Sequence, residues 1–177
     1  MNKPLVGILM GSDSDLSVMK EAAEVLEKEF GIGSEVHTLS AHRTPEAVVD
    51  FVKKSEAAGY KVFICGAGGA AHLAGVVAAH TALPVIGVPI MNKAAAGIDA
   101  LFSIAQMPPG IPVATVAING AKNAGILAAQ IIGVCDAEVR AKVGVYKEKM
   151  AKDIIAKDTE LQEKGFQKYL HDHDLLT

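Results

Sequence analysis

The chain contains no tryptophan, and aromatic residues make up only 5% of its 177 residues. Because half of the residues are nevertheless apolar, the interior must be filled mainly by Ala, Val, Ile and Gly. Small side chains of this kind suit helices packed closely on a sheet. The length is sufficient for one domain with a substantial core. The mean hydropathy of +0.30 is high for a monomer, which predicts contacts with other subunits.

The chain has only two cysteines, Cys65 and Cys135, and they lie far apart in apolar segments. The cysteines form no metal-spaced pair, so we predict two buried thiols. His171 and His173 are only two residues apart, and we expect them to belong to a solvated tail and not to a metal site. The formal net charge is −3, and no basic cluster is present. We therefore do not expect nucleic acid as a partner.

The chain also lacks a long unbroken hydrophobic run. The apolar segment Ala70–Val88 is interrupted by Pro84, Gly87 and two histidines, and the N-terminal residues lead directly into a short apolar run. These features predict neither a membrane span nor a signal peptide. We expect a cytoplasmic protein in a reducing compartment.

Short apolar runs alternate with helical patterns along the first 135 residues. Five runs are expected to be strands: Leu5–Met10, Glu35–Leu39, Val62–Cys65, Pro84–Val88 and Pro112–Ile118. Five segments are expected to be helices: Asp13–Phe30, Thr44–Ala58, Ala70–Thr81, Ala94–Ala105 and Asn119–Gly133. Continuous apolar runs are typical of parallel strands buried on both faces. This alternation predicts a doubly wound, three-layer α/β domain over residues 1–135.

The remaining residues, 136–177, have a different pattern. From Asp136 to about Gln167 apolar residues recur every three or four positions, which predicts an amphipathic helix. We expect this extra C-terminal helix to pack on a neighbouring subunit and the tail Tyr169–Thr177 to be frayed.

Chemically versatile residues follow three of the predicted strands. Gly11–Asp15 combines Gly with Ser and Asp, Ser40–Pro45 places a His beside an Arg, and Gly66–Leu73 is rich in Gly and ends near a second His. In open α/β sheets such loops meet beyond the carboxyl ends of the strands. There they can bind an anion and transfer a proton.

Each loop taken alone has a simpler structural explanation. Ser12, Asp13 or Ser14 can cap the following helix, and Thr44-Pro45 is a good helix start. The glycines of the third loop can serve a tight turn, with His72 as a packed polar residue. The convergence of all three loops favours a site for a small phosphorylated metabolite.

Five motifs together resemble the class I N5-carboxyaminoimidazole ribonucleotide mutases of purine biosynthesis. They are Gly-Ser-Asp-Ser-Asp, Ser-Ala-His-Arg-Thr-Pro, Ala-Gly-Gly-Ala-Ala-His-Leu, Leu-Pro-Val-Ile-Gly-Val-Pro and Ser-Ile-Ala-Gln-Met-Pro-Pro-Gly-Ile-Pro-Val-Ala-Thr. The resemblance extends from about Val6 to Ile132. It implies a flavodoxin-like fold, a homo-octamer, and isomerisation of N5-carboxyaminoimidazole ribonucleotide to 4-carboxy-5-aminoimidazole ribonucleotide. It implies no metal and no organic cofactor.

The resemblance also implies a set of site residues. His42 is the expected catalytic proton shuttle, because imidazole can both deliver and remove a proton near neutral pH. Arg43 and Ser14 are expected to hold the 5′-phosphate, and Asp15 the ribose hydroxyls. Gly68 and Gly69 would form a dry pocket for the migrating carboxyl group. The other expected substrate-binding residues are Ser12, Asp13, Ser40, Ala41 and His72.

Two alternatives are weighed against this interpretation. The related class II carboxylases, which use free carbon dioxide, have a Lys in place of Arg43 and a Ser-Asn pair within Gly69–His72. This chain has the mutase residues at both places. A non-catalytic nucleotide-binding module of the same fold is the other alternative, but it leaves the His-Arg pair without a task.

Overall fold

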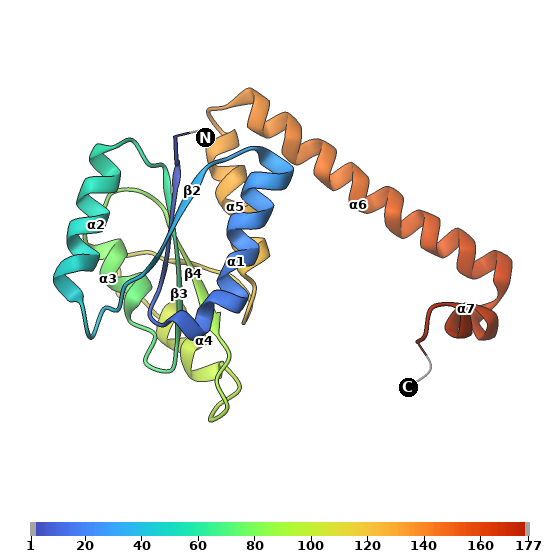
Figure 1. Cartoon of the computed structure of the whole chain (residues 1–177), viewed down its shortest axis with the longest axis horizontal. Coiled ribbons are helices and arrows are strands. Elements are labelled where there is room, and N and C mark those ends of the chain that lie inside the picture. The colour runs from blue at the N-terminus through green and yellow to red at the C-terminus, as the bar shows by residue number, and fades with distance from the viewer. Residues whose placement is uncertain (1–2, 176–177) are drawn as a thin grey trace.

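The sheet is built from five parallel strands in the order β2-β1-β3-β4-β5. A computed structural model describes residues 3–175 (Figure 1). The strands are β1 (Val6–Met10), β2 (Ser34–Thr38), β3 (Val62–Gly68), β4 (Val85–Ile90) and β5 (Ala114–Thr115). The helices of the α/β body are α1 (Leu16–Val25), α2 (Pro45–Ala57), α3 (Leu73–Ala79), α4 (Ile98–Ala105) and α5 (Ala121–Gly133).

The helices cover both faces of the sheet and enclose two apolar cores. One core lies between the sheet and α1, α5 and the first turns of the C-terminal helix. The other lies between the sheet and α2, α3 and α4. Glycines in the strands permit this close approach: a Cβ on Gly66 would collide with Met19, and one on Gly87 with Ile104. The three-layer, flavodoxin-like architecture predicted from the sequence is confirmed.

Two of the predicted strands differ from the observed ones. The run Glu35–Leu39 does form β2, but β2 is an edge strand whose residues are mostly half-buried or exposed. The expected strand Pro112–Ile118 shrinks to the two residues of β5. Pro112 has no N–H to donate to a ladder, and Asn119 just beyond has a left-handed φ of 57°.

Two of the predicted helices also start or continue differently. The segment Asp13–Phe30 is divided into a 3-10 turn (Asp13–Asp15), α1 and a π-helical turn (Leu26–Phe30). Helix α4 begins only at Ile98, because the Asn92 side chain accepts from the N–H groups of Ala94 and Ala95 and holds them in a turn. Gly97, with a φ of 86°, then redirects the chain into the helix.

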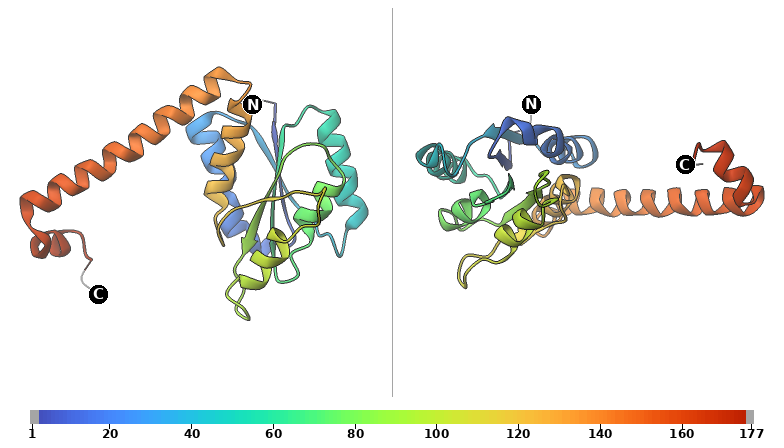
Figure 2. Two further views of the ribbon diagram at one scale, coloured as in Figure 1. Left: turned by 180° about the vertical axis from the view of Figure 1, so that it is seen from behind. Right: turned by 90° about the horizontal axis from the view of Figure 1, so that it is seen from below.

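The C-terminal helix α6 (Ala137–Lys164) leaves the body of the protein after its first turns (Figure 2). Val139, Val143 and Tyr146 are buried in the core under α1 and α5, whereas Met150 and Ile154 further along the same face are exposed. At 28 residues, the helix is about 42 Å long. The amphipathic pattern therefore has its apolar side covered at one end only.

The prediction of a frayed tail is wrong for Tyr169–Asp172, which are helical. Helix α7 (Phe166–Asp172) folds back beside the end of α6. Lys164 joins the two helices by ion pairs of 2.8 Å to both Glu160 and Asp172. The last two residues of the predicted tail, 176–177, lie outside the described residues.

The prediction of two buried thiols is correct for Cys65 and wrong for Cys135. Cys65 lies in the middle of β3, where burial raises the pKa of its thiol. Cys135 follows α5 in the turn that leads to α6, so its apolar neighbours in sequence do not enclose it.

Over residues 3–175, no helix is both long and apolar enough to cross a bilayer.

Candidate active site

A cavity of about 350 Å³ lies beyond the carboxyl ends of β1, β2 and β3. This is where the order of the strands reverses, since β2 and β3 lie on opposite sides of β1. The volume suits a small metabolite. The lining residues come from three loops: Gly11, Ser12, Asp15, Ser40, Ala41, His42, Arg43, Ala67, Gly68, Ala70, His72 and Leu73.

In the first loop, Ser12 is both a helix cap and a lining residue. Its Oγ accepts from the Ser14 N–H at 3.3 Å and from the Ser14 hydroxyl at 2.9 Å. Ser14 therefore orients Ser12 and does not itself line the cavity. Asp15 does line it, and partial burial raises the pKa of its carboxyl group despite a hydrogen bond from Ser14.

In the second loop, Ser40 and Thr44 close a tight turn that presents His42 and Arg43. The Ser40 hydroxyl oxygen accepts from the N–H groups of His42 (3.3 Å) and Arg43 (3.2 Å). The Thr44 hydroxyl bonds back to the Ser40 N–H and carbonyl. Thr44 thus occupies the N-cap position of α2 without capping a helix N–H, contrary to expectation, while Pro45 is the first helical residue as predicted.

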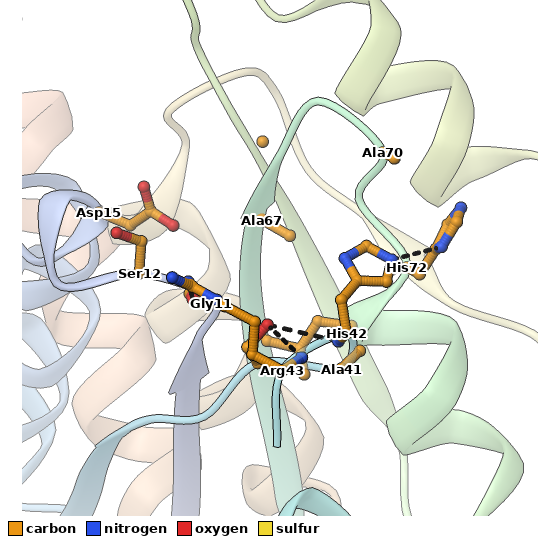
Figure 3. A pocket seen from close by; sticks show the side chains of 12 residues that line it. Gly11, Ser12, Asp15, Ala41, His42, Arg43, Ala67, Ala70 and His72 are labelled. Carbon is orange, nitrogen blue, oxygen red and sulfur yellow. Dashed lines mark hydrogen bonds between the residues drawn. The ribbon is translucent and has the colours of Figure 1, made fainter. Parts of the chain in front are cut away.

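Arg43 connects the second loop to the first. Its guanidinium Nη2 donates to the Gly11 carbonyl at 2.5 Å. Figure 3 shows the side chain extending along the cavity toward Ser12 and Asp15. A guanidinium has five N–H groups, so one held in this way can still donate several hydrogen bonds to an anion in the cavity.

His42 connects the second loop to the third. Its Nε2 lies 2.8 Å from Nδ1 of His72, and the two rings meet edge to face. At that distance one nitrogen carries a hydrogen and the other accepts it, so the two rings are joined by a hydrogen bond. Figure 3 shows His42 and Arg43 reaching in opposite directions from adjacent positions of the turn.

The third loop is shaped by two glycines. Gly68, the last residue of β3, lines the cavity, and a Cβ there would lie 3.2 Å from the Ile90 carbonyl oxygen. Gly69 has a φ of 63°, a left-handed conformation that favours glycine. Its conformation turns the chain toward Ala70 and His72, which line the cavity.

Residues 5–153 match the sequence model of the AIR carboxylase family. This chain belongs to the AIR carboxylase family. It is 56% identical, over 95% of its length, to proteins named N5-carboxyaminoimidazole ribonucleotide mutase from Thermotoga maritima and Pyrococcus horikoshii, and covers 98% and 94% of them. The crystal structure of Treponema denticola PurE superimposes with a TM-score of 0.82 at 39% identity, covering 89% of this chain and 98% of that one.

The structure of this family member brings most of the predicted site residues to one cavity. The exceptions are Asp13, Ser14 and Gly69, which act on the loop conformation and do not line the cavity. Gly11, Ala67, Ala70 and Leu73 line it without having been predicted. All four lie within the loops Gly11–Asp15 and Gly66–Leu73 that the sequence singles out, although they are not among the individual residues predicted to bind substrate.

Other polar groups of the chain lie away from this cavity. His37 bonds to Glu35 on the edge strand, and hydrogen bonds from Tyr60 and then His37 lower the pKa of Glu35. Asn119, the first residue of the predicted helix Asn119–Gly133, lies outside α5: its side chain accepts from the Met91 N–H, and Gly120 occupies the N-cap position. Within residues 3–175, no three His, Cys, Asp or Glu side chains gather in a way that could hold a metal ion.

Proposed function

We propose that this chain converts N5-carboxyaminoimidazole ribonucleotide to 4-carboxy-5-aminoimidazole ribonucleotide. The observation that carries the proposal is the turn Ser40–Pro45, which presents a proton-transfer group and an anion-binding group to one cavity. The relatives that are 56% identical carry the name of this mutase. The class I reading is favoured because Arg43 and the Ala70-Ala71-His72 sequence are the mutase residues.

The reaction moves a carboxyl group between two atoms of one nucleotide and needs one proton to be carried. The N5–carboxyl bond breaks to give carbon dioxide, and N5 takes a proton. C4 then attacks the carbon dioxide, and the C4 proton leaves to restore the aromatic ring. The reaction involves no net oxidation. One proton is delivered in the first step and one is removed in the last, so the protons balance.

His42 is the residue that we assign to this proton. An imidazole can donate and accept near neutral pH, and the hydrogen bond between its Nε2 and the His72 Nδ1 fixes the orientation of the ring. The bond also provides a second imidazole with which the proton can be shared. His72 is therefore a positioning partner for His42.

The opposite end of the cavity is assigned to the ribose 5′-phosphate. Arg43 supplies a guanidinium, and the Gly11–Asp15 loop adds the Ser12 hydroxyl, oriented by Ser14. Asp15 is placed to accept hydrogen bonds from the ribose hydroxyls, as carboxylates do in related folds. Ala67 and Gly68 then form the wall beside the reacting atoms, where exclusion of water would retain carbon dioxide.

The segment 136–177 is assigned to assembly. Beyond Tyr146 the apolar face of α6 is exposed at Met150 and Ile154, and Phe166 on α7 is exposed as well. An isolated helix with this pattern gains stability by burying that face. We assign the exposed apolar face to contact with a neighbouring copy in a homo-oligomer, which the resemblance predicts to be an octamer. We also expect the protein to be cytoplasmic and to need no organic cofactor.

The deciding experiment supplies purified protein with N5-carboxyaminoimidazole ribonucleotide in buffer freed of bicarbonate. We expect 4-carboxy-5-aminoimidazole ribonucleotide to form at a rate proportional to enzyme concentration. A parallel reaction contains aminoimidazole ribonucleotide with excess bicarbonate. Product only in the parallel reaction would establish the class II carboxylase instead, and product in neither would refute both.

A further inference from the structure

The carboxyl end of β4 is held on its outer side by one residue, Asn119. The ladder between β4 and β5 contains only two residue pairs, Ile86 with Ala114 and Gly87 with Thr115. Beyond them, the Asn119 N–H donates to the Pro89 carbonyl at 2.8 Å. The Asn119 side-chain Oδ1 accepts from the Met91 N–H at 2.9 Å. Asn119 therefore replaces the strand partner that β5 is too short to provide.

The sequence explains why a side chain is needed at this place. Groups on one side of a strand come from alternate residues, and on this side they come from Gly87, Pro89 and Met91. Pro89 has no N–H, so after its carbonyl the next group to be bonded is the Met91 N–H. Asn119 reaches both because its φ of 57° is left-handed, a conformation that Asn tolerates better than most residues.

The inner side of the same segment faces the wall of the cavity. In the register of β3 and β4, Ala67 pairs with Pro89 and Gly68 pairs with Ile90. Asn119 bonds the two residues that flank Ile90, and a Cβ on Gly68 would lie only 3.2 Å from the Ile90 carbonyl oxygen. Gly97 also closes on this point, since a Cβ there would lie 3.2 Å from the Met91 Cα. A shift of residues 89–91 would therefore move the backbone that lines the cavity.

We propose that Asn119 is a positioning residue: it fixes the end of β4, and through it the Ala67–Gly68 wall that retains carbon dioxide between the two halves of the reaction. This inference rests on the proposed function and adds a residue that touches neither the substrate nor the cavity. Its expected signature is leakage, in which turnover ends in free aminoimidazole ribonucleotide and carbon dioxide.

The test compares three variants with wild type in the mutase assay. Asn119→Gly permits the left-handed φ but removes the acceptor for Met91, whereas Asn119→Asp keeps an acceptor oxygen at the same place. Asn123→Ala is the matched control, because Asn123 is exposed on α5 and lines no part of the cavity. The readout is the ratio of released aminoimidazole ribonucleotide to carboxylated product, corrected by an enzyme-free blank. This ratio does not depend on how much of the protein is folded.

We expect Asn119→Gly to raise the leakage ratio at least threefold and to lower kcat, with KM changed less than twofold. KM should change little because Ser12 and Arg43, which are proposed to bind the phosphate, belong to loops that Asn119 does not contact. Asn119→Asp and Asn123→Ala should give wild-type ratios. If Asn119→Gly is insoluble, Asn119→Ser takes its place, since its hydroxyl is one atom shorter than the amide.

A wild-type leakage ratio in the variant without the acceptor would overturn the inference while leaving the mutase function intact. Equal leakage in the Gly and Asp variants would also overturn it, because the acceptor oxygen would then be irrelevant. Absence of wild-type turnover would refute the proposed function itself, and the inference with it.

Discussion

Replacing His42 by Asn is the substitution that tests the proton shuttle most directly. Asn retains a polar side chain but cannot deliver or remove a proton near neutral pH. The turn itself should persist, because the Ser40 hydroxyl oxygen binds the backbone N–H of residue 42 and not its side chain. The contact of Arg43 with Gly11 likewise does not involve His42.

The structure predicts very different sizes for the effects on stability and on rate. His42 is exposed, and it loses one hydrogen bond to His72, which should change the free energy of unfolding by about 1 kcal/mol or less. Loss of a positioned acid–base group costs about 10²- to 10⁴-fold in rate, or roughly 3–5 kcal/mol in activation free energy. Because the proposed mechanism uses the same imidazole in both halves of the reaction, we expect the upper part of this range.

The assay measures turnover of N5-carboxyaminoimidazole ribonucleotide alongside product affinity by calorimetry. We expect kcat to fall about 10³-fold or more, with the dissociation constant of the product changed less than threefold and Tm within a few degrees. His80→Asn is the control, since His80 is exposed at the end of α3 and outside the cavity. Turnover of His42→Asn within tenfold of wild type would refute the role of His42.

Two further predictions concern Asp15 and the C-terminal helices. Burial raises the pKa of Asp15, so its side chain is fully ionised only above that raised pKa. Nucleotide affinity should therefore fall as the pH decreases through this pKa, and the fall should occur at a higher pH than for an ordinary Asp. Calorimetry between about pH 7 and pH 4 should show this loss in wild type, whereas Asp15→Asn should have a weaker affinity that keeps only the pH dependence of the phosphate itself; equal pH dependence in both would contradict the assignment. A chain truncated after Lys149 keeps the buried Val139, Val143 and Tyr146 but loses the exposed part of α6, so it should stay folded and sediment as a smaller species; an unchanged assembly would show that this face does not bind a neighbouring copy.

The sequence predicts the fold well where strands are buried on both faces. The runs in β1, β3 and β4 are continuously apolar, and nearly all their residues are buried. Both features follow from the position of these strands between two layers of helices. The edge strands were harder to delimit. The sequence around β5 is as apolar as that of a central strand, but Pro112 and the left-handed Asn119 leave only two residues in the ladder.

The candidate site was predictable as a set of loops but not as a set of contacts. Strand ends mark the loops, and parallel strands bring these ends to one edge of the sheet. Which side chains meet there depends on turn geometry that has no periodic signal. The sequence singled out His42 and His72 separately, whereas their hydrogen bond depends on the turn at Ser40 and on the left-handed Gly69. The role of Ser14 behind Ser12 is likewise a matter of local hydrogen bonds.

The position of β1 in the sheet explains how two adjacent residues come to serve opposite ends of one cavity. β1 lies between β2 and β3. The loop that follows β2 can therefore reach both the loop that follows β1 and the loop that follows β3. Arg43 bonds to the Gly11 carbonyl of the first loop, and His42 bonds to His72 of the third (Figure 3). The distance between the proposed phosphate site and the proposed proton shuttle is therefore fixed by a single peptide unit in a turn closed by Ser40 and Thr44. In the proposed reaction, a substrate anchored at Arg43 would meet His42 on the adjacent residue of the same turn, which is the positioning that a reaction confined to one ring requires.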